Sequence, residues 1–182
     1  MSQIIEGLYI GSFADEKNKK FLTDARITHI LSAAWELQPS FPDMYEYLHV
    51  KLSDKPTFDL TTHLNGAVEF IERALQAGGR VLVHCYAGIS RSASCVIAYL
   101  IRIRKLSFES ALNLCQAKRP QVKPNKGFQD KLALYEQEHS GNEEVIPLPS
   151  PSLSSRSPVT VKYPKSPLLP PSFNVFAEDK VF

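Results

Sequence analysis

Cys85 and Arg91, separated by five residues, carry the strongest chemical signal in the sequence. The intervening stretch is short enough for a tight loop, and Gly88 lets that loop turn without a Cβ in the way. Where such a loop leads into a helix, backbone N–H groups and the positive end of the helix dipole converge on the cysteine. That setting stabilises a thiolate, the nucleophilic form of the side chain, and also suits the oxygens of a phosphate. Arg91 adds a guanidinium fork that can bind two of those oxygens, so the residues predict an activated thiol beside an anion site.

His84 and Ser92 flank this pair and strengthen the prediction. A lone cysteine is usually a small core residue, but His, Cys, Arg and Ser together on one strand-loop-helix segment favour the chemical interpretation of Cys85. We expect His84 to support the loop by hydrogen bonding with the backbone, and we assign it no proton transfer. Ser92 is a candidate N-cap of the helix that follows.

Strands and helices alternate along the chain around this loop. Apolar runs and alternating patterns predict strands at 28–32, 45–52 and 80–84, and short β-like pieces within 3–13. Apolar residues at three- and four-residue spacing predict helices at 64–75, 92–104 and 107–118, a last helix capped by Asn125, and a short helix near Phe21 and Leu22. The helix at 92–104 is apolar nearly all round and should be buried. The order predicts an α/β fold, a central and mostly parallel sheet flanked by helices.

The composition changes after residue 140. Eight of the 13 prolines and a run of serines lie there, without a helical or strand period. Such a segment cannot bury enough apolar surface to offset its ordering entropy. We therefore expect one folded domain at 1–140 and a disordered Pro/Ser-rich tail at 141–182. Three serines of the tail precede prolines and are candidate phosphorylation sites: Ser150, Ser157 and Ser166.

The overall composition narrows the class of protein. A length of 182 residues with 43% hydrophobic residues suits one domain, and a formal charge of +2 is too small to indicate nucleic acid or a membrane surface as partner. The three cysteines, Cys85, Cys95 and Cys115, fit neither a disulfide framework nor a zinc site. With no signal-peptide pattern and no apolar run of spanning length, we expect a soluble protein with reduced thiols in the cytoplasm or the nucleus.

The motif His84-Cys85-x5-Arg91-Ser92 resembles the phosphate-binding signature of the protein tyrosine phosphatase superfamily. The residues of the motif, 84–92, resemble the dual-specificity branch of that superfamily. Four further stretches resemble the same branch, in matching order and spacing: Gly7-Leu-Tyr-Ile-Gly11, Thr28-His-Ile-Leu31, Ala98-Tyr-Leu100 and Pro124-Asn-Lys-Gly-Phe128. The likeness covers about residues 3 to 138. Because the chain shows no docking domain before the catalytic region, it is similar to the small, atypical members of that branch.

The resemblance implies a two-step reaction without metal or cofactor. Cys85 attacks phosphorus to form a phosphocysteine, water hydrolyses this intermediate, and Arg91 binds the equatorial oxygens throughout. Ser92 would hydrogen-bond the thiolate and help it leave in the second step. The residues implied to surround the phosphate are Tyr86, Ala87, Gly88, Ile89, Ser90 and Arg91.

The leaving oxygen must be protonated, so a carboxylic acid has to lie over the loop. Three aspartates precede the cysteine in predicted loops, Asp43, Asp54 and Asp59. Asp54 directly follows a predicted strand and matches the position of the family's general acid, so we favour it. Asp59 is the second candidate, although it also stands where a helix cap is expected.

Asn125 corresponds to a family position that braces the phosphate loop and the acid loop, and its alternative role is a helix N-cap. Lys131 departs from the pattern, because the family usually has Gln three residues after Phe128. This departure concerns the detail of the supporting hydrogen bonds and leaves the implied chemistry unchanged.

Tyr86 and Ile89 stand where lipid phosphatases of the superfamily carry lysines, so the resemblance implies phosphoproteins as substrates. A compact chain implies a shallow pocket that accepts phosphotyrosine as well as phosphoserine and phosphothreonine. As partners we expect phosphoprotein substrates such as MAP kinases or other signalling kinases. We expect neither nucleic acid nor a membrane as partner, and we expect the protein to be a monomer. Two alternatives are a catalytically weak phosphopeptide-binding module of the same fold and a thiol redox protein, which would need a resolving cysteine near Cys85.

Overall fold

Five strands form a single sheet in the computed structural model, which describes residues 1–139. In spatial order they are β1 (Ser2–Ile5), β2 (Leu8–Ser12), β5 (Val81–Cys85), β3 (His29–Ser32) and β4 (Glu46–His49). β1 pairs with β2 in antiparallel fashion, and the other three pairings are parallel. The prediction of a mostly parallel sheet is confirmed. The carboxyl ends of β2, β5, β3 and β4 therefore meet at one edge, where the segment after Cys85 begins.

β5 is the central strand of the five, and all of its five residues are buried. A strand with parallel neighbours and both faces covered is expected to be a continuous apolar run. Its alternate side chains enter two separate clusters, since Val81 and Val83 lie in the larger core and Leu82 in the smaller one. This packing fixes the position of Cys85 at the end of the strand.

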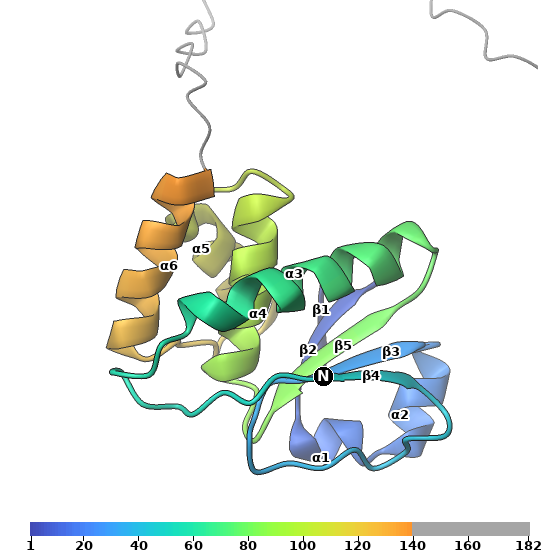
Figure 1. Cartoon of the computed structure of the whole chain (residues 1–182). Helices are drawn as coiled ribbons and strands as arrows, with labels where there is room; N and C mark the ends of the chain where they lie inside the picture. The colour runs from blue at the N-terminus through green and yellow to red at the C-terminus, as the bar shows by residue number, and fades with distance from the viewer. Residues whose placement is uncertain (140–182) are drawn as a thin grey trace, which may run out of the picture. The chain divides into compact units, whose positions relative to one another are not determined.

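Helices cover both faces of the sheet (Figure 1). On one face lie α3 (Thr61–Gln76), α4 (Arg91–Arg102), α5 (Phe108–Lys118) and α6 (Lys126–His139), and on the other lie α1 (Phe13–Glu16) and α2 (Lys19–Asp24). The first eleven residues of α4 are all buried, as its apolar sequence predicts. The helix next to the loop is thus held by the core on every side. Within residues 1–139, no helix has the length and apolar character needed to cross a bilayer.

The observed helix starts agree with the predicted cap Ser107 and differ from the predicted caps Asp59 and Ser92. Ser107 caps α5 by accepting a hydrogen bond from Ser110 N, as predicted. Asp59 does not cap α3, because that helix begins at Thr61 and Leu60 takes the cap position without a side-chain bond. Ser92 is not a cap either, because α4 begins at Arg91 and Ser92 is its second residue. Both errors come from a shift of one or two residues in the helix start.

Two further differences, and two other predictions, concern the edges of the fold. β4 is shorter than the predicted strand at 45–52, and the single-turn helix α1 has no counterpart among the predictions. The predicted short helix near Leu22 is α2, where Leu22 is buried and Phe21 is 48% exposed. The predicted tail at 141–182, with Ser150, Ser157 and Ser166, lies outside the described residues.

Candidate active site

Cys85 lies at the junction of β5 and α4, at the base of the loop formed by residues 86–90. Its side chain is buried, and the backbone N–H of Gly88 donates a hydrogen bond to Sγ at 3.3 Å. Ser92 Oγ lies 3.3 Å from the same sulfur atom. The structure thus brings a thiol, a loop N–H and a hydroxyl together, as the motif predicts.

The carbonyl groups of the loop all bond to donors outside it. Phe13 N bonds the Tyr86 carbonyl (3.1 Å), Lys123 N bonds the Ile89 carbonyl (3.0 Å), and Arg119 bonds the carbonyls of Ala87 (Nη2, 3.2 Å) and Gly88 (Nε, 2.9 Å). In a trans peptide unit the N–H points away from the C=O. The N–H groups of residues 87–90 are therefore turned away from these outer donors, toward the space above the sulfur. This space is suited to a phosphate.

Gly88 is required in this loop for two reasons. Its φ angle is 70°, in the left-handed region that other residues rarely adopt. A Cβ at this position would also lie 2.5 Å from the carbonyl oxygen of Gly11 and 2.6 Å from Arg119 Nη2. The predicted role of this glycine in a tight turn is confirmed.

Arg91 is 7% exposed and is oriented by groups that the sequence did not reveal. Its Nη1 donates to both carboxylate oxygens of Glu36, at 2.6 and 2.8 Å, and lies 3.4 Å from the Leu52 carbonyl. Its Nε is buried and has no hydrogen-bond partner within residues 1–139. Because Nη1 is held by Glu36, the edge that carries Nε remains for two oxygens of an anion.

Asp54 lies over the loop, where the general acid is predicted. Its Oδ1 accepts hydrogen bonds from Ser90 Oγ (2.7 Å) and from Asn125 Nδ2 (2.8 Å). Its Oδ2 lies 3.9 Å from Arg91 Nε. Asn125 also caps α6, since its Oδ1 accepts from Phe128 N at 2.9 Å. The two alternative roles of Asn125 therefore coexist.

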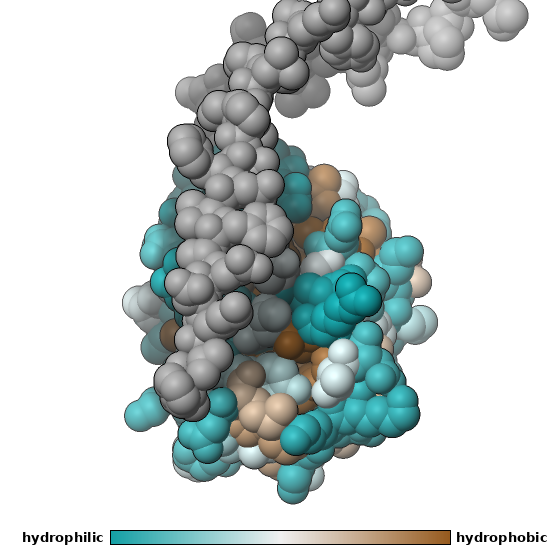
Figure 2. Space-filling model, turned by 90° about the vertical axis from the view of Figure 1, so that its right-hand side faces the viewer, coloured by the Kyte–Doolittle hydropathy of each residue, from teal (hydrophilic) through white to brown (hydrophobic). Residues whose placement is uncertain are grey.

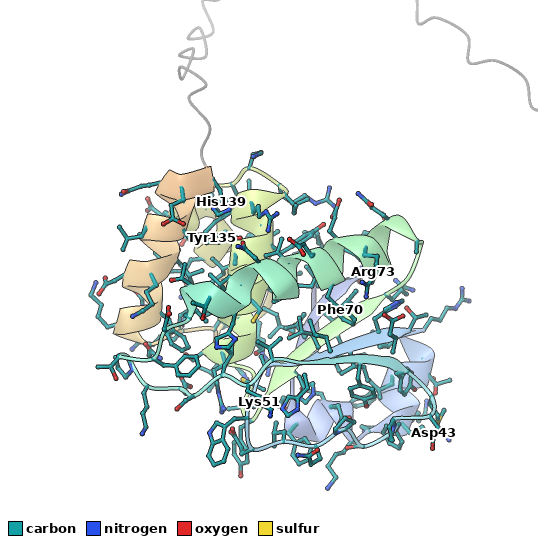
Figure 3. The ribbon with its side chains drawn as sticks, viewed as in Figure 1. Asp43, Lys51, Phe70, Arg73, Tyr135 and His139 are labelled. Carbon is teal, nitrogen blue, oxygen red and sulfur yellow. The ribbon has the colours of Figure 1, made fainter. Side chains whose placement is uncertain are left out.

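The other two aspartates are placed differently. Asp43 precedes β4 and so lies near the amino end of that strand (Figure 3), whereas Cys85 is the last residue of the parallel strand β5. Asp59 is exposed, and its described hydrogen bond uses the backbone carbonyl rather than the carboxylate. Among the three candidates, Asp54 is the one bonded to the phosphate loop.

The segment after Asp54 is anchored to α6. A Cβ at Gly127 would lie only 1.9 Å from the carbonyl oxygen of Pro56, so the missing side chain permits a close backbone approach. Lys131 Nζ donates to the same carbonyl at 3.3 Å. The residue that departs from the family pattern is therefore a further anchor of the acid loop.

His84 is 1% exposed, and neither ring nitrogen has a hydrogen-bond partner within residues 1–139. The expected bond to the backbone therefore has no close partner, although the Cys85 backbone lies near enough to favour the protonated ring, and the ring stacks on Phe13 with centroids 6.4 Å apart. Burial lowers the pKa of His84 to about 4, although the nearby Glu16 carboxylate acts in the opposite direction. The ring is neutral at pH 7 and supports the loop by packing.

Cys95 and Cys115 are fully buried on α4 and α5. Burial raises the pKa of each thiol to about 12. Such thiols are poor nucleophiles at neutral pH, and their packing matches the predicted core role. Neither cysteine is therefore suited to attack an oxidised Cys85 and form a disulfide with it, as a thiol redox protein would require.

Sequence reasoning missed three residues of the site, Glu36, Ser90 as the bridge to Asp54, and Arg119. Glu36 follows β3, and the carboxyl ends of parallel strands meet at one edge, so its position was a usable signal. Arg119 is only 8% exposed, but nothing in its neighbourhood in the sequence marks it as buried.

Comparisons with known proteins agree with this geometry. The family model described as "Dual specificity phosphatase, catalytic domain" matches residues 8–138. Dual specificity protein phosphatase 1B of Arabidopsis thaliana is 41% identical over 142 residues, 78% of this chain and 85% of the relative. MAP kinase phosphatase with leucine-rich repeats protein 3 of Dictyostelium discoideum is 42% identical over 136 residues, 74% of this chain but only 16% of the relative.

A solved structure shows the same fold. The crystal structure of human DUSP28 is 31% identical, with a TM-score of 0.73, and the match covers 76% of this chain and 96% of that one. The predicted resemblance is confirmed, and the relatives support a protein phosphatase. The chain belongs to the dual specificity phosphatase family.

Proposed function

We propose that this chain hydrolyses phosphate esters of tyrosine, serine and threonine in proteins through a phosphocysteine at Cys85. The observation that carries the proposal is the convergence on one loop of three groups: the Cys85 sulfur beside Ser92 Oγ, the Nε edge of Arg91, and the Asp54 carboxyl. Each group supplies one requirement of phosphoryl transfer, namely a nucleophile, an anion clamp and a proton donor.

In the first step the Cys85 thiolate attacks phosphorus. The S–P bond forms as the ester P–O bond breaks, and Asp54 gives its proton to the leaving oxygen of the side chain. The loop N–H groups and Arg91 bind the three equatorial oxygens, which carry the charge of the transition state. The dephosphorylated substrate then leaves.

In the second step water attacks phosphorus. Asp54, now a carboxylate, takes a proton from the water, the S–P bond breaks, and inorganic phosphate forms. Ser92 Oγ, 3.3 Å from the sulfur, donates a hydrogen bond to the departing thiolate. Asn125 and Ser90 position Asp54 through its Oδ1.

The surface around the loop supports phosphoproteins as substrates. Tyr86 is 66% exposed and Ile89 is 36% exposed, so the loop presents an aromatic and an aliphatic side chain where a polyphosphorylated lipid headgroup would need cations. We also propose phosphorylated kinases among the substrates, which the name of the MAP kinase phosphatase relative supports.

Turnover of p-nitrophenyl phosphate tests the nucleophile. Cys85→Ser should abolish turnover while a phosphopeptide still binds, and Cys115→Ala is the matched control that keeps activity. Full turnover by Cys85→Ser contradicts the covalent mechanism. A wild type that binds phosphopeptide without any turnover favours the binding-module alternative.

Leaving-group dependence tests the acid. Asp54→Asn should lose more activity on alkyl phosphates than on p-nitrophenyl phosphate, because a good leaving group needs less protonation. Asp59→Asn is the matched control and should lose little on either substrate. If Asp54→Asn lost the same activity on both substrates, another residue would have to be the proton donor.

A further inference from the structure

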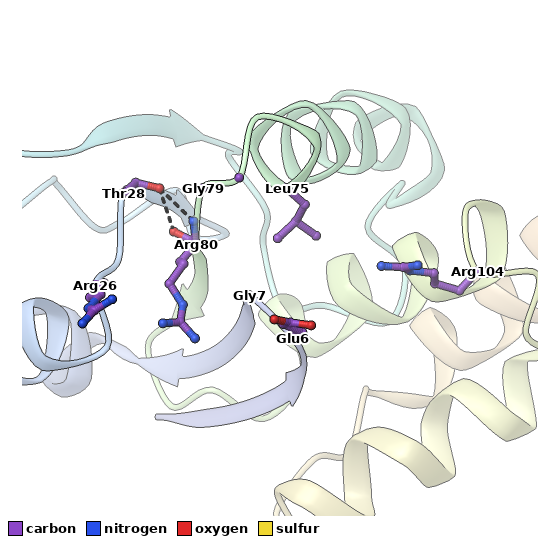
Figure 4. Close-up of a pocket in the computed structure, with 9 residues that line it drawn as sticks. Glu6, Gly7, Arg26, Thr28, Leu75, Gly79, Arg80 and Arg104 are labelled. Atoms are coloured by element: carbon purple, nitrogen blue, oxygen red, sulfur yellow. Dashed lines mark hydrogen bonds between the residues drawn. The ribbon is translucent and has the colours of Figure 1, made fainter. Parts of the chain in front are cut away.

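A pocket of about 570 Å³ is lined by residues that include Gly79 and Arg80 (Figure 4). These residues precede β5, whereas Cys85 ends that strand, so the pocket lies at the opposite end of β5 from Cys85. The turns that precede β2, β3 and β5 and the segment after α4 line it. Figure 2 views this end of the molecule, where hydrophilic side chains lie beside a smaller hydrophobic area. Arg80 directly precedes β5, so at roughly 3.3 Å per residue the pocket lies about 16 Å from Cys85. One phosphate group cannot occupy both places.

Three arginines and one carboxylate give this pocket a positive charge. Arg26, Arg80 and Arg104 line it together with Glu6. The arginine ion pairs found within residues 1–139 involve none of the three. Arg26 and Arg80 lie on one side of Glu6 and Arg104 on the other (Figure 4). Guanidinium groups from three separate segments therefore surround one space without a paired carboxylate.

Two of these arginines are held in place by other contacts. The backbone of Arg80 is fixed by Thr28, whose Oγ1 accepts from Arg80 N (2.8 Å) and donates to Arg80 O (3.2 Å) (Figure 4). The Arg80 guanidinium lies over the Tyr9 ring at 5.8 Å, and that of Arg104 lies over the Tyr99 ring at 5.9 Å. An aromatic ring covers the face of a guanidinium but leaves the N–H groups in its plane available.

We propose that this pocket binds the phosphate group of a second ligand, apart from the substrate phosphate at Cys85. A phosphate dianion offers three terminal oxygens and can accept from more than one guanidinium, whereas a carboxylate offers two. Leu75 adds an apolar wall for the carbon part of the ligand. The volume lies within the range of small-molecule sites, about 300–1,000 Å³. The phosphate can belong to a free phosphorylated molecule or to a phosphorylated side chain of a protein.

The experiment is an NMR titration of the ¹⁵N-labelled Cys85→Ser chain, which by the proposed function should bind phosphate without turnover. One arm adds sodium pyrophosphate and the other adds a phosphothreonine peptide. We expect the amide signals of Gly78 and Gly79 to shift in a saturable way, and Arg80→Gln to weaken that binding about tenfold. Glu6→Gln should strengthen it, because a repelling carboxylate is removed.

Arg73→Gln is the matched control, since Arg73 lies on α3 outside the pocket and pairs with Glu46. Shifts with pyrophosphate support a free phosphorylated ligand, and shifts with the peptide alone support a phosphorylated protein. The proposal is overturned if neither probe moves Gly78 and Gly79, or if Arg73→Gln weakens binding as much as Arg80→Gln. The amide of Gly88 reports the catalytic loop separately, so failure here is distinct from failure of the proposed function.

Discussion

Arg119 Nε donates a hydrogen bond of 2.9 Å to the carbonyl oxygen of Gly88, and the same guanidinium bonds the Ala87 carbonyl at 3.2 Å. The Ala87 carbonyl belongs to the peptide unit whose N–H, on Gly88, points at the Cys85 sulfur at 3.3 Å. Arg119 therefore sets the direction of loop donors without approaching the phosphate itself. It is a positioning residue.

Replacing Arg119 should lower kcat more than it changes KM. In Arg119→Met the two carbonyls lose their partner, the loop N–H groups lose their fixed direction, and donors that act on transition-state charge are worth about tenfold or more in rate. Steady-state kinetics on p-nitrophenyl phosphate measures this. Gln121→Ala is the control, because Gln121 reaches the Ala87 carbonyl only at 3.5 Å and from the surface. Equal kcat in Arg119→Met and Gln121→Ala would show that Arg119 has no such role.

Glu36 should matter for the binding of phosphate by Arg91. With Glu36→Ala, Nη1 loses both carboxylate contacts and the guanidinium gains freedom, so we expect kcat/KM to fall by about tenfold. Glu46→Ala removes another carboxylate paired with an arginine, Arg73, and should leave kcat/KM unchanged. An activity gain in Glu36→Ala would instead mean that Glu36 competes with the phosphate for Arg91.

The stability of the folded protein should decrease as the pH falls from about 6.5 toward 4. Burial depresses the pKa of His84 to about 4 in the folded state, whereas the unfolded chain has the ordinary value near 6.5. Between these values the unfolded state binds the proton and the folded state does not, so protonation favours unfolding. The contribution of neutral His84 to the free energy of unfolding is complete above pH 6.5, and about 3 kcal/mol of it is lost by pH 4.

Urea unfolding followed by circular dichroism at several pH values measures this free energy. In His84→Gln the free energy of unfolding should depend less steeply on pH over this range. An identical slope in the variant would contradict the assignment.

Alkylation should distinguish the three thiols. Burial raises the pKa of Cys95 and Cys115 to about 12, so neither forms an appreciable thiolate at pH 7. We expect iodoacetate to add one carboxymethyl group, at Cys85, and inorganic phosphate to slow the reaction by occupying the loop. Intact mass and peptide mapping provide the measurement. Labelling of Cys95 in the folded protein would show that α4 opens far more readily than its burial suggests.

The elements that carry the site were predictable from the sequence because their signals are local. The apolar run 81–83 and the helix that follows the loop have no other reasonable assignment, and Gly88 marks the turn between them. Asn125 was assigned two alternative roles, and the structure shows both, because its oxygen and its nitrogen serve different partners.

The residues that escaped prediction depend on contacts between distant segments. Glu36 and Arg91 are 55 positions apart, and Arg119 and Gly88 are 31 positions apart. No periodicity connects such pairs; the place of Glu36 after a strand puts it near the site, but its bond to Arg91 and the bond of Arg119 to Gly88 are known only from the fold. The errors at Asp59 and Ser92 have another cause, since helix starts are uncertain by one or two residues in any pattern.

The contact between Pro56 and Gly127 has a consequence for substrate choice. Because one absent β-carbon lets the acid segment rest on the backbone of α6, the height of Asp54 above the sulfur is set by helix packing. We therefore expect this segment to keep its position over the loop when a substrate binds. Discrimination among phosphoproteins then depends on how well their surfaces match a fixed rim, which makes selectivity a matter of docking geometry more than of induced fit.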